Sequence, residues 1–124
     1  MGLFASPSDG DELGGALFSY SLFSERNVSN GVEQIELEFK IHGEGHLHGD
    51  GFALWLTKQR ATQGPVFGSA DNFEGLGIFF DTYKNNRPGT SFPFVMAMMG
   101  DGKTTYDQAH DGKANQLAGC SVCI

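Results

Sequence analysis

Cationic side chains are few in this sequence, and long apolar segments are absent from it. Eight Lys and Arg stand against fifteen Asp and Glu, which gives a formal net charge of -7. Phosphate binding needs clustered Lys and Arg, so this balance argues against nucleic acid as a partner. No apolar run approaches the roughly 18 residues of a membrane span. The first residues lack the basic and long apolar regions of a signal peptide, so the chain by itself is expected to be soluble.

Cysteine is also scarce, with only Cys120 and Cys123, both close to the end of the sequence. A Cys-x-x-Cys pair can form half of a zinc site or a redox pair. The sequence has no second Cys pair, and no predicted helix follows the motif to lower a thiol pKa. Neither a structural zinc site nor a redox centre is therefore favoured here.

Glycine and phenylalanine, in contrast, are abundant. The 124 residues include 18 Gly and eleven Phe, and 40% of the side chains are hydrophobic. This length suits one domain and is too short for two. The many Gly predict frequent tight turns, which is typical of all-β proteins.

Hydrophobic periodicity predicts strands along most of the chain. Residues 33–41 alternate apolar and polar side chains, as in a strand with one face toward solvent. Residues 52–56 and 76–81 are apolar on both faces and predict buried strands, which places Trp55 in the core. Weaker patterns predict strands at 16–23, at 92–99, at 104–106 after a hairpin turn at 100–102, and near Leu117.

The remaining segments are predicted to be irregular. Residues 1–15 are polar and Gly-rich, which predicts loop or disorder. Residues 25–31 are predicted to turn, and residues 57–73 to form a long connection. No convincing helix and no internal repeat is present. Five or six short strands joined by Gly-containing turns predict an antiparallel sandwich.

A candidate cation site begins where the strand at 76–81 ends. The sequence runs Phe-Phe-Asp-Thr-Tyr-Lys-Asn-Asn at 79–86, so Asp81, Tyr83 and Asn85 follow one another at every second position. A carboxylate, a backbone carbonyl and an amide oxygen can all reach one hard cation, as calcium requires. A carboxylate after a buried strand also needs a strong partner, because its desolvation is costly. Asp81 could equally be an Asx-turn residue that ends the strand.

Further motifs flank this segment in a specific order. Gly-Asp-Gly precedes it at 49–51, Gly-Pro-Val-Phe-Gly-Ser lies between at 64–69, and Tyr-Asp-Gln-Ala-His-Asp-Gly follows at 106–112, before Ala-Gly-Cys at 118–120. Together these motifs resemble the L-type lectins, the legume-like lectin domains of cargo receptors that carry glycoproteins between endoplasmic reticulum and Golgi. The resemblance extends over residues 15–122.

The resemblance implies a fold and a domain organisation. The fold would be an all-β antiparallel jelly-roll sandwich of the concanavalin A-like type. Residues 16–124 would be the central part of the domain, truncated at both ends and without the signal peptide, stalk and membrane anchor of the cargo receptors. A part-domain leaves sheet edges and a core face uncovered, which predicts weak stability or self-association.

The resemblance also implies a set of calcium ligands. Asp81 would be the main ligand, Tyr83 would supply its backbone carbonyl, Asn85 its side-chain oxygen, and Asp111 a second carboxylate. The residues alone leave open that Asp111 is only the Asp of an Asp-Gly turn. Relatives with two calcium ions carry acidic residues where this sequence has Lys84 and Asn86, so one ion is predicted.

The implied sugar ligands are Asp50, Asn85 and Gln108. Asp50 would accept hydrogen bonds from two mannose hydroxyls, and Asn85 would donate its amide nitrogen to another. Gln108 occupies a position that usually holds His, and its amide can still bond a hydroxyl. From the residues alone, Asp50 could simply belong to a hairpin turn. By this resemblance, the C-terminal loop with which the family selects mannose would not be part of these 124 residues.

The expected function is calcium-dependent binding of high-mannose N-glycans, without catalysis, in the endoplasmic reticulum, the intermediate compartment and the Golgi. One alternative is a truncated fragment that binds calcium without useful sugar binding. Another is a jelly-roll glycoside hydrolase that uses Glu36 and Glu38, although their alternation with apolar residues is that of an ordinary solvated face. His46 and His48 could bind zinc, but exposed histidines in a Gly-rich loop are the plainer interpretation.

Overall fold

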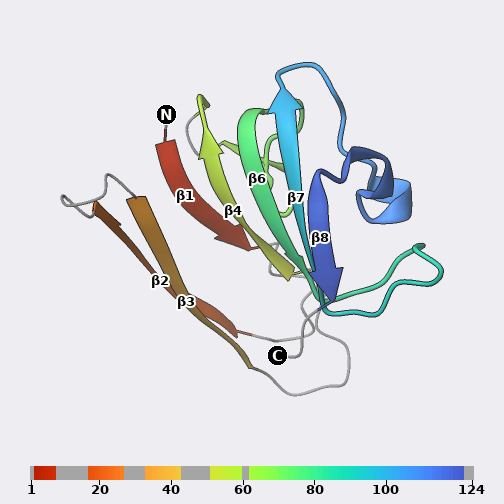
Figure 1. Cartoon of the computed structure of the whole chain (residues 1–124), viewed down its shortest axis with the longest axis horizontal. Helices are drawn as coiled ribbons and strands as arrows, with labels where there is room; N and C mark the ends of the chain where they lie inside the picture. The colour runs from red at the N-terminus through yellow and green to blue at the C-terminus, as the bar shows by residue number, and fades with distance from the viewer. Residues whose placement is uncertain (1, 8–16, 27–32, 43–50, 60–61, 122–124) are drawn as a thin grey trace.

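The computed structural model describes residues 2–7, 17–26, 33–42, 51–59 and 62–121. These residues form an antiparallel five-stranded sheet in the order β1-β4-β6-β7-β8, a two-stranded sheet of β2 and β3, and two short 3-10 turns (Figure 1). The five-stranded sheet consists of β1 (Gly2–Pro7), β4 (Gly51–Thr57), β6 (Glu74–Asp81), β7 (Phe94–Asp101) and β8 (Ala118–Ser121). The other elements are β2 (Leu17–Arg26), β3 (Glu33–His42), β5 (Gln63–Val66), η1 (Gln108–His110) and η2 (Lys113–Asn115).

One face of the five-stranded sheet carries an aromatic core. The indole of Trp55 is fully buried, as the sequence predicts, and meets Phe73 and Phe79 edge-on at ring-centroid distances of 4.9 and 5.3 Å. Phe67 stacks on Phe79, and Tyr106 packs edge-on against it. Burial of each such ring stabilises the fold by about 1.5–3 kcal/mol. The core therefore anchors the two irregular segments that carry Phe67 and Tyr106.

The opposite face of the sheet packs against β3. Phe52 and Phe80 stack with their centroids 4.4 Å apart, and Phe39 lies 4.5 Å from Phe52. Glu36 and Glu38, on the other face of β3, are exposed. Because successive side chains of a strand point to opposite faces, this is the arrangement that the alternating pattern at 33–41 predicts.

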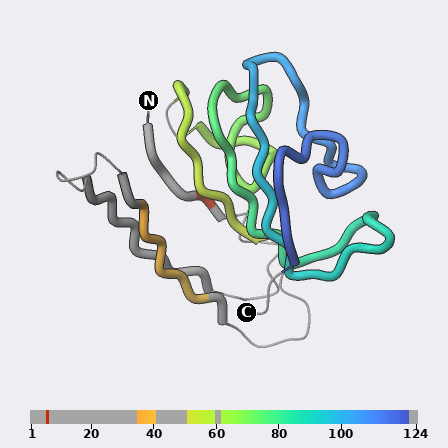
Figure 2. The backbone as a smooth tube through the Cα atoms, viewed as in Figure 1, coloured from red at the N-terminus to blue at the C-terminus, as the bar shows by residue number. Residues whose placement is uncertain are grey.

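The register of β6 fixes where the candidate site lies. Asp81, the last residue of β6, pairs with Gly51 of β4 and with Phe94 of β7. The loop that follows Asp81 and the segment that precedes β8 lie on the same side of the sheet (Figure 2). Hydrogen bonds from Asn85 and Asn86 to Asp111 join these two segments. The sheet thus brings two segments that are distant in sequence to one end of β6.

The strands predicted at 33–41, 52–56, 76–81 and 92–99 are confirmed to within a few residues. The prediction of loop at 1–15 is wrong for residues 2–7, which pair along their whole length with β4. An edge strand of this kind is stabilised by its ladder with a neighbour, which its own short sequence does not show. Residues 8–15 lie outside the described residues.

Four further predictions need correction. Residues 104–106 form no strand, because the Asp101 carboxylate accepts the backbone N–H groups of Lys103 and Thr104 and turns the chain away from β7. Residues 25–26 continue β2 where a turn is predicted, and the long connection at 57–73 contains β5. Two single 3-10 turns occur where no helix is predicted.

Candidate functional site

Asp81 ends β6 with a buried carboxylate. The residue is only 5% exposed, and its Oδ1 accepts the backbone N–H of Tyr83 at 3.0 Å. This hydrogen bond is an Asx-type turn, which redirects the chain at the end of the strand. The turn and a ligand role are compatible, because the turn holds the carboxylate at the point where the following loop begins.

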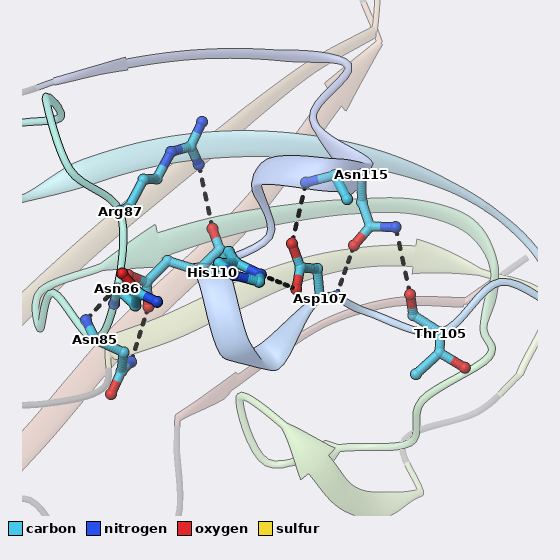
Figure 3. Close-up of polar contacts among 9 residues, drawn as sticks. Asn85, Asn86, Arg87, Thr105, Asp107, His110 and Asn115 are labelled. Atoms are coloured by element: carbon cyan, nitrogen blue, oxygen red, sulfur yellow. Dashed lines mark hydrogen bonds and ion pairs between the residues drawn. The ribbon is translucent and has the colours of Figure 1, made fainter.

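The loop after Asp81 wraps around a second buried carboxylate, that of Asp111. Asp111 Oδ2 accepts the backbone N–H groups of Asn85 and Asn86, each at 3.0 Å, and Oδ1 accepts Nδ2 of Asn85 at 2.8 Å. Figure 3 labels Asn85 and Asn86, and dashed lines mark their polar contacts. Asp111 is 4% exposed. Three N–H donors on one carboxylate are charge-assisted bonds of the stronger kind. Asp111 therefore does more than end an Asp-Gly turn.

Asp107 organises the segment that presents Asp111. Its Oδ1 lies 3.0 Å from His110 Nδ1, its Oδ2 accepts the N–H of Ala114 at 3.2 Å, and its carbonyl accepts the N–H of Gly112 at 2.8 Å. Partial burial raises the pKa of the Asp107 carboxyl, but the bonds from His110 and Ala114 outweigh burial and hold the pKa below its ordinary value. Asp111 itself takes the left-handed conformation between η1 and η2, with φ 52° and ψ 41°.

Tyr106 connects the two carboxylates electrostatically. The phenol is 5% exposed, and burial raises its pKa well above the ordinary value. The negative charges of Asp81 and Asp111 raise the pKa of Tyr106 further. Both carboxylates therefore act on one hydroxyl, although they come from different parts of the chain.

Arg87 is the buried cation of this region. It is 6% exposed, and its Nη1 donates to the backbone carbonyl of Asp111 at 3.2 Å. The guanidinium lies over the ring of Phe94 with Cζ 4.4 Å from the centroid, and Nη2 donates to Oε1 of Gln116. These contacts tie the loop after β6 to β7 and to the segment that carries Asp111.

The donor set fits calcium. Two buried carboxylates, the Asn85 amide and the Tyr83 carbonyl are the oxygen ligands that this ion takes. Within the described part of the chain, no three His, Cys, Asp or Glu side chains are placed to hold a metal ion, so the neutral oxygens are needed. Because Nδ2 of Asn85 bonds Asp111, the Oδ1 of Asn85 is directed elsewhere.

The predicted sugar ligands do not all belong to the cluster around Asp111. Asn85 belongs to the cluster around Asp111, whereas Gln108 is exposed in η1 and donates its Nε2 to the carbonyl of Pro65 at 3.0 Å. Asp50 lies outside the described residues, as do His46 and His48. Gly51, which follows Asp50 in sequence, pairs with Asp81.

Sequence reasoning missed Arg87, Tyr106 and the organising role of Asp107. The sequence does offer a clue to the burial of Tyr106, because Tyr106 is the only large apolar side chain in the polar stretch 101–116. The sequence offers no such clue for Arg87, since a single Arg in a polar loop is normally solvated. The contacts of Asp107 depend on the 3-10 turns that follow it, which have no periodic pattern.

Comparison with known proteins defines the class of protein to which this fold belongs. A family model described as the legume-like lectin family matches residues 10–124. The chain therefore belongs to the legume-like lectin family, and its fold is the antiparallel β-sandwich of that family.

Particular relatives are closely similar over part of their length. An L-type lectin-like domain-containing protein of Schizosaccharomyces pombe is 54% identical over 90 residues, which are 72% of this chain and 29% of that protein. The human VIP36-like protein is 45% identical over 95 residues, which are 73% of this chain and 27% of that protein. The chain thus spans less than a third of the length of these relatives.

Solved structures of the VIP36 exoplasmic/lumenal domain are also similar. The Ca2+/Man-bound form is 48% identical with a TM-score of 0.61, over 66% of this chain and 34% of that chain. The Ca2+/Man3GlcNAc-bound form is 31% identical with a TM-score of 0.62, over 96% of this chain and 58% of that chain. A metal-free form of the same domain matches at a TM-score of 0.61.

Proposed function

We propose that this chain binds high-mannose N-glycans in a calcium-dependent manner. The observation that carries the proposal is the pair of buried carboxylates, Asp81 and Asp111, with the loop at 82–87 folded between them. Buried carboxylates are costly unless they are paired or bind a metal. The relation to a VIP36 domain whose structure is a Ca2+/Man-bound form supports the same function.

Each ligand has a defined task in this proposal. Asp81 and Asp111 hold the ion with their carboxylates, Tyr83 with its main-chain carbonyl, and Asn85 with its side-chain oxygen. Bound calcium would supply positive charge that fixes these oxygens in one geometry. The N–H groups of Asn85 and Asn86 keep Asp111 oriented, so the protein aligns this ligand through its own bonds.

A single calcium ion is part of the proposal. Lys84 lies between the ligands of the loop and is exposed. Its positive charge opposes a second cation nearby, since like charges repel over several ångströms even in water. Asn86 contributes its backbone N–H to Asp111, which assigns it a structural role.

The sugar would be bound by Asp50, Asn85 and Gln108. Asn85 is central, because its amide can contact the ion through one end and a sugar hydroxyl through the other. That arrangement requires the amide to exchange its bond to Asp111 Oδ1 for one to a hydroxyl. Gln108 keeps its Oε1 as an acceptor while its Nε2 bonds Pro65.

The cellular role in this proposal is glycoprotein transport between endoplasmic reticulum and Golgi, in a longer membrane-anchored protein. One curated relative is named a vesicular integral-membrane protein, VIP36, and is 48% identical over 92 residues in the human protein. Neither of the described helical turns, each three residues long, could cross a membrane.

A second candidate function is calcium binding without sugar binding. It is favoured by the bond between Gln108 and Pro65, which occupies one end of the only predicted sugar ligand in η1. A glycoside hydrolase has no such support. Glu36 and Glu38 lie exposed on a two-stranded ribbon, whereas paired catalytic acids flank a bound sugar.

Titration calorimetry tests the proposed function. Calcium is titrated first, and mannobiose or Man3GlcNAc is then added to the loaded and to the calcium-free protein. We expect calcium heat that disappears in Asp81→Asn and persists in Asp101→Asn, a matched change of an exposed carboxylate at the other end of the same sheet. Sugar heat is expected only after calcium loading.

The other outcomes decide between the candidates. Calcium heat without sugar heat would favour the second candidate. A folded sample that binds no calcium would overturn the ligand assignment and leave membership of the family unaffected.

A further inference from the structure

Arg87 is buried, and among the residues that the structure describes no acidic side chain contacts its guanidinium. Its contacts are the Asp111 carbonyl, Gln116 Oε1, the sulfur of Met96 at 3.6 Å and the face of Phe94, all of them neutral. Within the part of the chain that the structure describes, no salt bridge involves this guanidinium. A charge removed from water costs several kcal/mol unless its surroundings compensate it. The neutral contacts of Arg87 must therefore compensate this cost.

The contacts of Arg87 converge on both carboxylate ligands. Nη1 fixes the carbonyl of Asp111, whose left-handed backbone links the direction of that carbonyl to the direction of its side chain. The guanidinium rests on Phe94, which is the register partner of Asp81 across β6 and β7. The backbone of Arg87 itself directly follows Asn86, which donates to Asp111.

We propose that Arg87 is a positioning residue for the calcium site, and that this buried cation strengthens calcium binding by holding Asp111 against the loop at 82–87. The inference rests on the proposed function, because it assigns Asp111 as a ligand. Groups that orient metal ligands from behind typically change metal affinity by about 10- to 100-fold when they are removed.

The direction in which calcium affinity changes distinguishes a positioning role of Arg87 from a purely electrostatic one. A cation near a calcium site repels the ion, so its removal should strengthen calcium binding if charge alone mattered. If Arg87 positions Asp111, its removal should weaken calcium binding although a positive charge is lost. Lys84 provides the matched control, because it is an exposed cation in the same loop.

The experiment compares calcium affinity by calorimetry in Arg87→Met, Arg87→Lys and Lys84→Met. We expect Arg87→Met to bind calcium at least ~10-fold more weakly than the unmodified chain. The calcium affinity of Arg87→Lys should lie between those of Arg87→Met and the unmodified chain. One ammonium can reach the Asp111 carbonyl but cannot also bond Gln116 as the planar guanidinium does. Lys84→Met should bind calcium as tightly as the unmodified chain or more tightly.

A second measurement needs no calcium. Hydrogen exchange of the Asn85 and Asn86 amides, both donors to Asp111, is followed in the presence of a chelator. Arg87→Met should exchange these two amides faster, whereas Lys84→Met should leave them protected. A role confined to general stability would instead speed exchange across the sheet and leave the calcium affinity of the folded protein unchanged.

The outcomes are distinct. Equal or tighter calcium binding by folded Arg87→Met would overturn the inference while the proposed function stands. Absence of calcium binding by the unmodified chain would overturn both. If Arg87→Met does not fold, Gln116→Ala removes the Nη2 acceptor from an exposed residue. Weaker calcium binding by that variant supports the inference, and unchanged binding overturns it.

Discussion

Asp111 is held both through its side chain and through its backbone. Asn85 and Asn86 donate three N–H groups to its carboxylate, and Arg87 donates to its carbonyl. The sequence predicted the residue as a ligand from resemblance, and it could not show this framework. Local N–H donors depend on the path of the loop, which has no periodic pattern from which it could be derived.

Replacement of this carboxylate has two expected consequences. Asp111→Asn loses one acceptor oxygen and points an amide nitrogen at N–H donors, which should lower the free energy of unfolding by about 1–3 kcal/mol. Calcium binding should be lost. Urea unfolding followed by circular dichroism, together with calcium calorimetry, measures both. Asp101→Asn is the control, since it should lose less stability and keep calcium affinity.

The neighbouring Gly112 is predicted to tolerate no side chain. Its φ is +76°, and a Cβ there would lie 2.6 Å from the Met96 methyl and 2.7 Å from the Tyr106 ring. Gly112→Ala should therefore destabilise the protein by roughly 2–4 kcal/mol, from backbone strain together with overpacking. Gly89 also has a positive φ, of +80°, but open space around it.

Gly89→Ala measures the cost of backbone strain without crowding by neighbouring atoms. We expect it to lower the thermal midpoint less than Gly112→Ala does. Equal losses in the two variants would show that the predicted crowding against Met96 and Tyr106 is absent.

The Asp107 carboxylate predicts a pH dependence. Because its pKa is held below the ordinary value, ionised Asp107 stabilises the folded chain above the unfolded-state pKa of about 4. That contribution is lost as pH falls through the lowered pKa. The thermal midpoint of the unmodified chain should thus exceed that of Asp107→Asn at pH 7, and the difference should shrink as the pH falls below about 4. A difference that does not change with pH would contradict this.

Among the strands, β1 shows what periodicity can and cannot predict. The strands β3, β4, β6 and β7 follow from alternating or continuous apolar patterns, because their side chains pack on one or both faces. β1 depends on its ladder with β4 and on Ser6, whose Oγ accepts from the Trp55 indole at 2.8 Å and donates to the Phe67 carbonyl at 2.6 Å. Tertiary contacts of this kind have no local sequence signal.

This network gives a testable prediction for the edge of the sheet. Ser6→Ala removes the acceptor of the Trp55 indole and the donor to the Phe67 carbonyl, and should lower the free energy of unfolding by about 1–3 kcal/mol. Urea unfolding is best followed by circular dichroism, because Trp55 fluorescence would report the lost bond itself. Ser121→Ala, which removes an exposed bond to the Ser91 carbonyl, should cost less than ~1 kcal/mol. Similar losses in both would contradict a role of Ser6 in fixing β1.

Taken together, the sheets form part of a sandwich, and the sequence predicted this architecture from its motifs. The four predicted ligands do come to one end of β6, namely Asp81, Tyr83, Asn85 and Asp111, and their calcium role stays a prediction. The sequence could not predict Arg87, because the value of a buried cation depends on neighbours from β7 and from the segment before β8.

Self-association also stays a prediction. On the face of the sheet away from the aromatic core, Leu76 pairs with Met99 and Ile78 with Ala97, and Met99 is 59% exposed. Apolar area exposed in this way favours pairing with a second copy of the chain. We expect a sedimentation coefficient that rises with protein concentration, and a smaller rise for Met99→Lys. A monomer at all concentrations would show that this face needs no partner.

The most direct test of the calcium site is an amide NMR titration of the isotope-labelled chain with calcium. The site predicts shifts at the amides of Tyr83, Asn85, Asn86 and Gly112, and no shift at those of Lys58 and Gly102, which lie at the other end of the sheet. Shifts confined to residues 42–50 would assign the metal to that His-containing segment instead. Absence of any shift in a folded sample would contradict calcium binding by this chain.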